Sequence, residues 1–168
     1  MVELLQMKKF VLKRPRNISN NIILLPQTSL LLNTDIAINN SELIEDINVL
    51  VGEFLKTISK YSNVDLLYLK SIDQTIHMLR NANVLLYMVD GYIIGYLSYN
   101  FREYNDSVYI NEIYVREKYR RSGIGKQLLD YVASIVSDND KYENLSLSVH
   151  ENNEIAKQFY LKYGFKFC

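Results

Sequence analysis

Several features that would assign this chain to a specialised class are missing from its sequence. The only cysteine is Cys168, which excludes a disulfide within the chain and suits a reducing compartment. Basic and acidic side chains number 19 each, so there is no excess positive charge for non-specific contact with nucleic acid. The longest apolar stretches, such as 22–25 and 84–89, are far shorter than the ~20 residues of a membrane-spanning helix. These absences predict a soluble, cytoplasmic protein with neither a nucleic-acid nor a membrane partner.

No secretory leader and no repeat is visible either. Residues 1–16 mix apolar and basic side chains, without the continuous apolar segment and small-residue cleavage site of a secretory signal. The rest of the chain shows no internal repeat and no low-complexity tract. A chain of 168 residues with 48% hydrophobic content has the size and composition of one domain with a sizeable core.

The pattern of apolar residues predicts a mixed α/β layout. Four segments with apolar residues at three- and four-residue spacings predict helices, namely 41–58, a segment after Ser71, 123–136 and Glu154–Tyr163. Four segments rich in β-forming residues predict strands, namely 84–89, 92–99, Ser107–Val115 and 145–149. The first two strands are joined by Asp90 and Gly91, which suit the positive φ angles of a type I′ hairpin turn. The order of these elements indicates an α/β fold with a mixed sheet.

The first forty residues fit this layout less clearly. Ile22–Leu25 and 30–32 flank the turn-forming residues 26–29, an arrangement compatible with a β-hairpin. We therefore treat residues 1–40 as an N-terminal extension and residues 41–168 as the functional domain.

The most informative segment is a basic, glycine-containing turn between a strand and a helix. The strand ends at Val115, and the helix begins near Gly123. Unpaired backbone N–H groups at such a helix start converge on one point and bind anions. Glycine at positions 123 and 125 would let a phosphate approach the backbone without a Cβ in the way. Positive charge is added by Arg120, Arg121 and Lys126.

Two common phosphate-binding motifs do not fit this segment. The P-loop needs a glycine five residues before its Gly-Lys pair and a Ser or Thr after it, where this chain has Arg120 and Gln127. The dinucleotide-binding fingerprint needs a third glycine where Leu128 stands. A nucleotide-binding domain of either kind is therefore disfavoured.

The same turn resembles a motif of one known superfamily. Residues 120–125, Arg-Arg-Ser-Gly-Ile-Gly, are similar to the (Gln/Arg)-x-x-Gly-x-(Gly/Ala) pyrophosphate loop of the GNAT superfamily of acetyl-CoA-dependent N-acetyltransferases. They follow a strand ending at Val115 at that family's usual offset. A later block at 153–165 resembles the family's Asn-x-x-Ala-x-x-x-Tyr-x-x-x-Gly-Phe pattern. Two blocks in the correct order, separated by one helix and one strand, identify the chain as a member of this superfamily.

The resemblance implies a GNAT fold, which is a mixed central β-sheet flanked by helices in a single domain, with acetyl-CoA as co-substrate and no metal. By this analogy the strand edge at Ile113, Tyr114 and Val115 would pair with the pantetheine arm, and the Val115 amide would polarise the thioester carbonyl. Asn153 would hydrogen-bond the pantetheine region. The pyrophosphate would lie on the turn, whose residues are Arg120, Arg121, Ser122, Gly123, Ile124, Gly125 and Lys126.

The reaction also needs a group that takes a proton from the amine and one that gives a proton to the departing thiolate. The resemblance implies Tyr160 as the proton donor. Glu112, a carboxylate on the strand before the turn, is the favoured base, and Tyr109 is its rival. Strand alternation places these two on opposite faces unless a bulge intervenes, so at most one should face the acceptor in a regular strand. His150 is a third candidate, although a histidine at a strand end is typically solvated.

The implied function is transfer of an acetyl group to a primary amine, in a peptide or a small molecule, by direct attack in a ternary complex. The alternative is a non-catalytic acyl-CoA-binding module, which is disfavoured because Glu112, Asn153 and Tyr160 are all present. The acceptor pocket is expected around 59–69 and 101–106, which contain tyrosines but no diagnostic charge cluster. The acceptor and the choice between monomer and homodimer therefore stay open.

The resemblance also predicts an irregularity at one edge of the sheet. Family members usually continue beyond the Gly-Phe pair with another strand, whereas this sequence ends at Cys168. An uncovered edge would be an aggregation hazard. We therefore expect the strands within 22–32, or a second subunit, to cover part of it.

Overall fold

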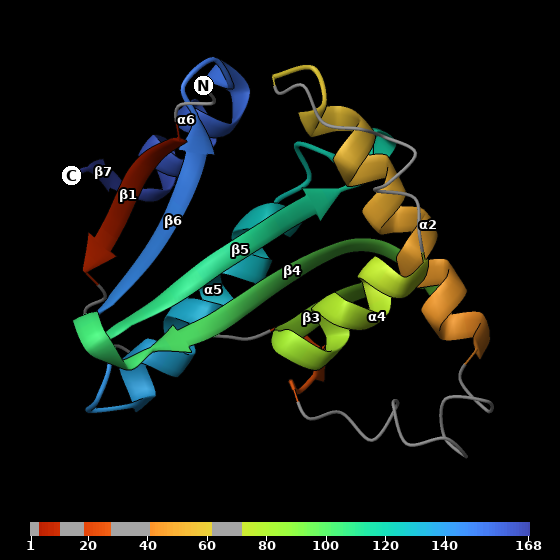
Figure 1. The fold of residues 1–168 in the computed structure, drawn as a ribbon, viewed down its shortest axis with the longest axis horizontal. Helices are drawn as coiled ribbons and strands as arrows, with labels where there is room; N and C mark the ends of the chain where they lie inside the picture. Colours follow the sequence, from red (N-terminus) through yellow and green to blue (C-terminus); the bar gives the residue numbers. More distant parts are fainter. Residues whose placement is uncertain (1–3, 11–18, 28–40, 62–71) are drawn as a thin grey trace.

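The structure is a computed structural model that describes residues 4–10, 19–27, 41–61 and 72–168 (Figure 1). It contains one sheet of seven strands, in the order β2-β3-β4-β5-β6-β1-β7. The strands are β1 (Leu4–Phe10), β2 (Ile22–Leu25), β3 (Asn83–Val89), β4 (Tyr92–Arg102), β5 (Ser107–Val115), β6 (Asn144–His150) and β7 (Lys166–Phe167). The helices are α2 (Ser41–Ile58), α4 (Ile72–Asn81), α5 (Ile124–Asp138) and α6 (Glu154–Tyr163), with the 3-10 turns η2 (Glu103–Asn105) and η3 (Glu117–Tyr119).

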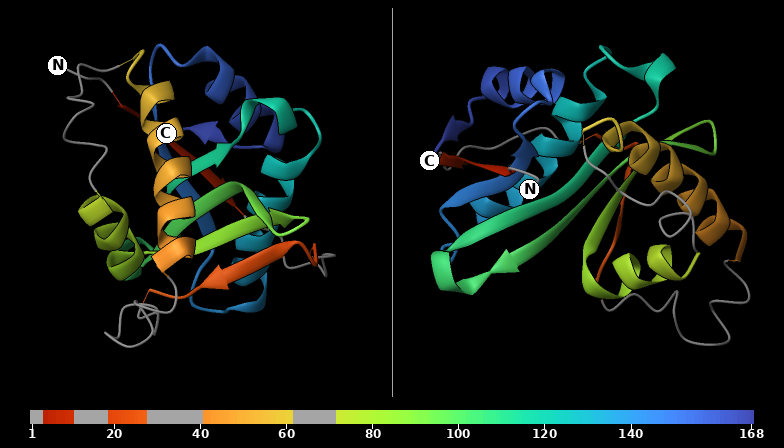
Figure 2. Two further views of the ribbon diagram at one scale, coloured as in Figure 1. Left: turned by 90° about the vertical axis from the view of Figure 1, so that its right-hand side faces the viewer. Right: turned by 45° about the horizontal axis from the view of Figure 1, so that its top comes forward.

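The helices form two layers on opposite faces of this sheet (Figure 2). α2 and α4 pack over β3, β4 and β5, whereas α5 and α6 pack on the other face. Successive residues of β4 supply the two cores, since Tyr96 lies in the core under α2 and Leu97 lies in the core under α5. None of the described helices is long and apolar enough to cross a membrane.

The predicted elements are confirmed with small changes at their ends. In the hairpin between β3 and β4, Asp90 has a φ of 50° and Gly91 a φ of 80°, the signs that a type I′ turn requires. α6 ends at Gly164, whose φ is 106° and whose N–H donates to the carbonyls of Tyr160 and Leu161 at 3.1 and 3.0 Å.

A β-bulge in β5 opens the middle of the sheet. Ser98 of β4 pairs with Glu112, but the next residue, Tyr99, pairs with Ile110, so Asn111 is the extra residue of the bulge. The parallel pairing of β5 with β6 ends at Ile110, opposite Leu147. Beyond this point β5 continues along β4 as far as Val115, and β5 and β6 separate (Figure 1). One backbone edge of β5 is therefore left without a β6 partner from Asn111 onward.

The N-terminal strands occupy opposite sides of the sheet, and one prediction about them is wrong. β1 pairs antiparallel with β6 along its whole length and with β7 on its other side. β2, which contains Ile22, lies instead at the far edge of the sheet against β3. The edge beyond β6 is thus covered by residues 4–10, not by the strand at 22–25. Residues 30–32, the second half of the expected hairpin, lie outside the described residues.

Candidate active site

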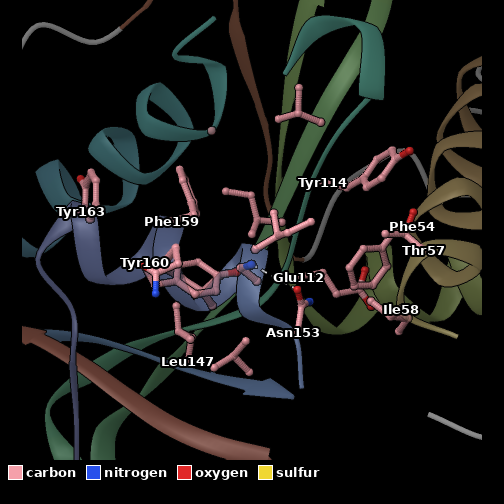
Figure 3. Close-up of a pocket in the computed structure, with 18 of the residues that line it drawn as sticks. Phe54, Thr57, Ile58, Glu112, Tyr114, Leu147, Asn153, Phe159, Tyr160 and Tyr163 are labelled. Carbon is pink, nitrogen blue, oxygen red and sulfur yellow. Dashed lines mark hydrogen bonds between the residues drawn. The ribbon is translucent and has the colours of Figure 1, made fainter. Parts of the chain in front are cut away.

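A cleft of about 1950 Å³ opens where β5 and β6 separate. This volume is above the roughly 300–1,000 Å³ of most small-ligand pockets, so it can hold an extended ligand beside a second molecule. Figure 3 shows Phe159 and Tyr160 of α6 on one side of the cleft, Phe54 and Thr57 of α2 on the opposite side, and Glu112 between them.

The cleft brings together all but one of the predicted site residues. Those that line it are Tyr109, Glu112, Ile113, Tyr114, Val115, Arg120, Arg121, Gly123, Ile124, Gly125, Lys126, Asn153 and Tyr160. His150 lines it as well. Ser122 is the exception, and its hydroxyl donates to the carbonyl of Tyr119 inside the turn.

The turn before α5 has a backbone geometry that leaves N–H groups at the start of the helix. Arg121 and Gly123 both have a positive φ, at 61° and 85°. Gly123 is the N-cap of α5, and as a glycine it has no side chain with which to cap the helix. The first N–H groups of a helix have no intrahelical partner, so an uncapped start offers them to an anionic ligand.

Two of the three predicted basic side chains are engaged with the protein itself. Nε of Arg120 donates to the Val115 carbonyl at 2.8 Å, and its guanidinium lies 5.3 Å from the centre of the Tyr114 ring. Nζ of Lys126 lies 2.6 Å from a carboxylate oxygen of Asp130. Both side chains therefore already have partners within the protein itself.

Gly125 has a packing role that the sequence did not reveal. A Cβ at this position would lie 3.0 Å from Cζ of Phe159, so the absence of a side chain lets α6 approach α5. Gly52 in α2 provides a contrast, because no atom of the described residues lies within 4 Å of the Cβ it would carry.

Substitution of these two glycines should have opposite effects on stability. Gly52→Ala is expected to raise the free energy of unfolding by up to about 1 kcal/mol, because alanine favours a helix interior. Gly125→Ala should lower it by about 1 kcal/mol, because the overpacking against Phe159 outweighs that gain. Urea denaturation of the two variants measures both values. Equal stabilisation of the two variants would show that the Phe159 ring moves away from the new Cβ at little cost.

The strand edge of β5 presents a backbone donor to the cleft. The N–H of Arg116 donates to the Ile94 carbonyl of β4 at 2.9 Å. Backbone donors alternate in direction along a strand, so the N–H of Val115 points away from β4 and toward the space between β5 and β6. This is the position expected for a donor to a thioester carbonyl.

The bulge brings both candidate bases to the same face of the sheet. Glu112 pairs with Ser98 and Tyr109 pairs with Asn100, and these two partners are two residues apart on β4. Residues two apart on a strand share a face. The exception foreseen for a bulge therefore applies, and Glu112 and Tyr109 both line the cleft.

The carboxyl group of Glu112 is half-buried and hydrogen-bonded. Oη of Tyr96 donates to Oε2 of Glu112 at 2.7 Å. Burial raises the pKa of Glu112 above its ordinary value, and the hydrogen bond from Tyr96 lowers it in part. A carboxylate whose pKa is shifted toward neutrality is better matched to accepting a proton from an amine.

Tyr109 belongs to a row of polar side chains that crosses four strands. Its hydroxyl lies 2.5 Å from Oγ of Ser148 on β6, and Ser148 accepts a hydrogen bond of 2.6 Å from Nε2 of Gln6 on β1. The guanidinium of Arg102 on β4 lies 3.3 Å from the centre of the Tyr109 ring. The N-terminal strand thus contributes directly to the surroundings of a candidate base.

Asn153 and Tyr160 are fixed by α6. Asn153 is the N-cap of this helix, and its Oδ1 accepts from the N–H of Ala156 at 3.1 Å, which leaves its Nδ2 as a donor for a ligand. The ring of Tyr160 is buried edge-to-face against Phe165, with 5.7 Å between ring centres. Burial raises the pKa of Tyr160, so its hydroxyl stays protonated at neutral pH and can act as a donor.

The side of the cleft that is expected to take the acceptor was only partly predicted. α2 contributes Phe54, Thr57 and Ile58, and Tyr61 follows the helix with its ring 5.8 Å from that of His150. Among the described residues the lining does not include 101–106, so the expected contribution of that loop is wrong. Its place at the other end of β4 and β5 explains the difference (Figure 1). Residues 62–69 lie outside the described residues.

The same fold occurs in solved acetyltransferases. The PaiA N-acetyltransferase of Thermoplasma acidophilum, in complex with coenzyme A, aligns at a TM-score of 0.61 with 20% identity, over 74% of this chain and 84% of that one. An aminoglycoside N-acetyltransferase in complex with CoA aligns at 0.61 with 17% identity, over 91% of both chains. A ribosomal-protein-alanine N-acetyltransferase from Brucella melitensis aligns at 0.56 with 20% identity, over 84% and 88%. No curated protein sequence matches this chain significantly.

These similarities place the fold among the N-acetyltransferases that bind coenzyme A. Residues 55–165 match the profile of the Acetyltransferase (GNAT) family, and the chain belongs to this family. The matched region runs from the end of α2 to Phe165 and includes the bulge, the turn before α5 and all of α6. Acetyl-CoA is the co-substrate of such enzymes, and the described residues contain no group of three side chains that could hold a metal ion.

Proposed function

We propose that this protein is an N-acetyltransferase that moves the acetyl group of acetyl-CoA to a primary amine by direct attack in a ternary complex. One observation carries the proposal. Within the described residues, the cleft is lined along one continuous space by the start of α5, the edge of β5 beyond its pairing with β6, the carboxyl group of Glu112 and the phenol of Tyr160.

The co-substrate would lie between β5 and β6. The backbone N–H groups of 121–126 would bind its pyrophosphate at the start of α5. Its pantetheine arm would add to the free edge of β5 as an extended chain, with Nδ2 of Asn153 as a further donor. The thioester carbonyl would then accept a hydrogen bond from the N–H of Val115.

The chemistry follows from this placement. The amine nitrogen attacks the thioester carbonyl carbon, and the N–H of Val115 stabilises the negative charge that develops on the oxygen. Glu112 takes a proton from the amine, with Tyr109 as the alternative on the same face. The C–S bond then breaks, and Tyr160 gives its proton to the departing thiolate.

The acceptor is a primary amine of a peptide or a small molecule. The solved neighbours are named for unlike acceptors, an aminoglycoside and a ribosomal-protein alanine, so the shared fold does not select between these classes. The acceptor side of this cleft is largely aromatic and apolar, with Phe54, Ile58 and Tyr61 on the α2 side.

Calorimetry with acetyl-CoA and an assay of thiol release with panels of peptides and small amines test the proposal. We expect heat on binding and a rate of release that depends on the amine. Binding without release would indicate an acyl-CoA-binding module, and the absence of binding would refute the proposal.

A matched pair of glycine variants tests the role of the turn. Gly123→Ala places a side chain at a φ of 85° in the turn, and we expect it to weaken acetyl-CoA binding about tenfold or more. Gly91→Ala introduces comparable strain at a φ of 80° in a hairpin that does not line the cleft, and should leave the Kd unchanged. Equal weakening by both would assign the effect to general destabilisation.

A further inference from the structure

Tyr96, a fully buried tyrosine, donates a hydrogen bond to the carboxyl group of Glu112 from within the core. Tyr96 has no exposed surface and does not line the cleft. Its hydroxyl donates to Oε2 of Glu112 at 2.7 Å, across the pairing of β4 with β5. Ser98, directly opposite Glu112, has no hydrogen-bond partner for its buried hydroxyl within the described part of the chain.

The position of the Tyr96 ring is determined by its packing. Phe54 of α2 meets it edge-to-face with 6.1 Å between ring centres, and Tyr114 is its direct neighbour on β5. Ile47 and Leu50 of α2 belong to the same buried cluster. Side chains in a close-packed core stay in one rotamer, so the hydroxyl stays aimed at one point of the cleft wall.

We propose that Tyr96 is a positioning residue, which fixes Oε2 of Glu112 and leaves Oε1 as the oxygen that receives the proton of the acceptor amine. The inference rests on the proposed role of Glu112 as the base. A carboxylate with one oxygen anchored presents its other oxygen in a constant direction, as proton transfer requires.

Burial and the hydrogen bond act in opposite directions on the pH range in which Glu112 can act. Burial raises the pKa of Glu112, and the bond from Tyr96 opposes this by stabilising the carboxylate. Tyr96 remains a donor throughout, because burial and the nearby carboxylate raise its own pKa well above the ordinary value of a phenol.

Several other titratable or charged groups surround this part of the cleft. They are Glu53 of α2, Tyr109 and Tyr114 of β5, His150 of β6, and Arg116 and Arg120 after β5. Glu53 is occupied with Arg116 at 3.3 Å and accepts from Tyr114 at 3.3 Å. Tyr96 is the group that bonds Glu112 directly.

Tyr96→Phe keeps the ring and removes the donor. Burial then acts unopposed, so the pKa of Glu112 should rise, and the fall of kcat/KM at low pH should begin about one pH unit higher. The rate on the plateau above that limb should also fall, because the unanchored carboxylate no longer presents Oε1 in one constant direction. Tyr99→Phe is the matched control, because Tyr99 is also a buried tyrosine of β4 but lies in the core under α5.

Carbon NMR and the assay of amine-dependent turnover together separate this proposal from the proposed function. Carbon NMR of labelled glutamate, assigned with Glu112→Gln, follows the titration of Glu112 whether or not the enzyme turns over. Its midpoint should rise in Tyr96→Phe and fall when Tyr96 is replaced by 3-fluorotyrosine, which is a stronger donor. If the midpoint does not move, or if Tyr99→Phe moves it equally, the proposal is wrong. A moved midpoint without amine-dependent turnover would support the contact and refute the enzyme function.

Discussion

Glu112→Gln is expected to lower kcat/KM by about 10²–10⁴-fold at neutral pH, because the amide retains the shape of the carboxyl group but cannot take a proton from the amine. Initial rates of thiol release across a pH series measure the effect. In the wild type, activity should fall as pH decreases through the raised pKa of Glu112, since the base must be ionised. This limb should therefore lie above the roughly 4.3 of an ordinary glutamate, and it should disappear in the variant.

Tyr109→Phe is the comparison that decides between the two candidate bases. Both side chains line the cleft from the same face of β5. If Glu112 is the base, Tyr109→Phe keeps the low-pH limb and most of the rate, although the contact with Ser148 is lost. A Glu112→Gln variant that retained both its rate and its low-pH limb would transfer the role to Tyr109.

The stability of the Glu112→Gln variant should rise while its activity falls. The pKa of Glu112 is raised in the folded protein, so the folded state binds this proton more tightly than the unfolded chain does. The free energy of unfolding of the wild type therefore decreases as the pH rises from the pKa of Glu112 in the unfolded chain to its pKa in the folded protein. Above the folded-state pKa the loss of stability is complete. Glutamine does not ionise, so the variant avoids this loss of stability. Denaturation at neutral pH can therefore show that the variant is folded even though its activity is low.

The sequence predicted the regular parts of the fold because each depends on local information. The helix at Ser41–Ile58 and the strand at Ser107–Val115 agree with their predicted bounds, since apolar periodicity alone determines them. The hairpin at Asp90 and Gly91 follows from two residues that tolerate positive φ. β1 was missed because only Leu5 and Met7 among its described side chains belong to the core, and Lys9 breaks the alternation two positions later.

The parts of the site that were not predicted depend on pairing between distant residues. The bulge at Asn111 is defined by the register of β5 against β4, and the local sequence of β5 does not predict it. Tyr96 is one of fourteen tyrosines, and its contact with Glu112 follows from that same register. The packing reason for Gly125 likewise needs Phe159, which is 34 positions later in the chain. Motifs identified the components of the cleft, whereas tertiary structure determined which of them face one another.

Tyr160→Phe is expected to lower kcat by about 10²-fold or more with little change in the Kd for acetyl-CoA. The substitution keeps the ring that packs against Phe165 and removes the hydroxyl group whose proton the departing thiolate would receive. Because burial raises the pKa of Tyr160, its ionisation should cause no fall in the wild-type rate near neutral pH. Thiol-release rates give kcat, and calorimetry gives the Kd.

Tyr163→Phe is the matched control for this effect, because it removes a hydroxyl from the same helix, one that donates to Asp130 at 2.7 Å. A general loosening of α6 would lower the activity of both variants and weaken their binding of acetyl-CoA. A loss of proton donation would lower kcat in Tyr160→Phe alone and leave its binding intact. Equal and unimpaired rates in both variants would mean that solvent protonates the thiolate and that Tyr160 serves only to pack α6 against the sheet.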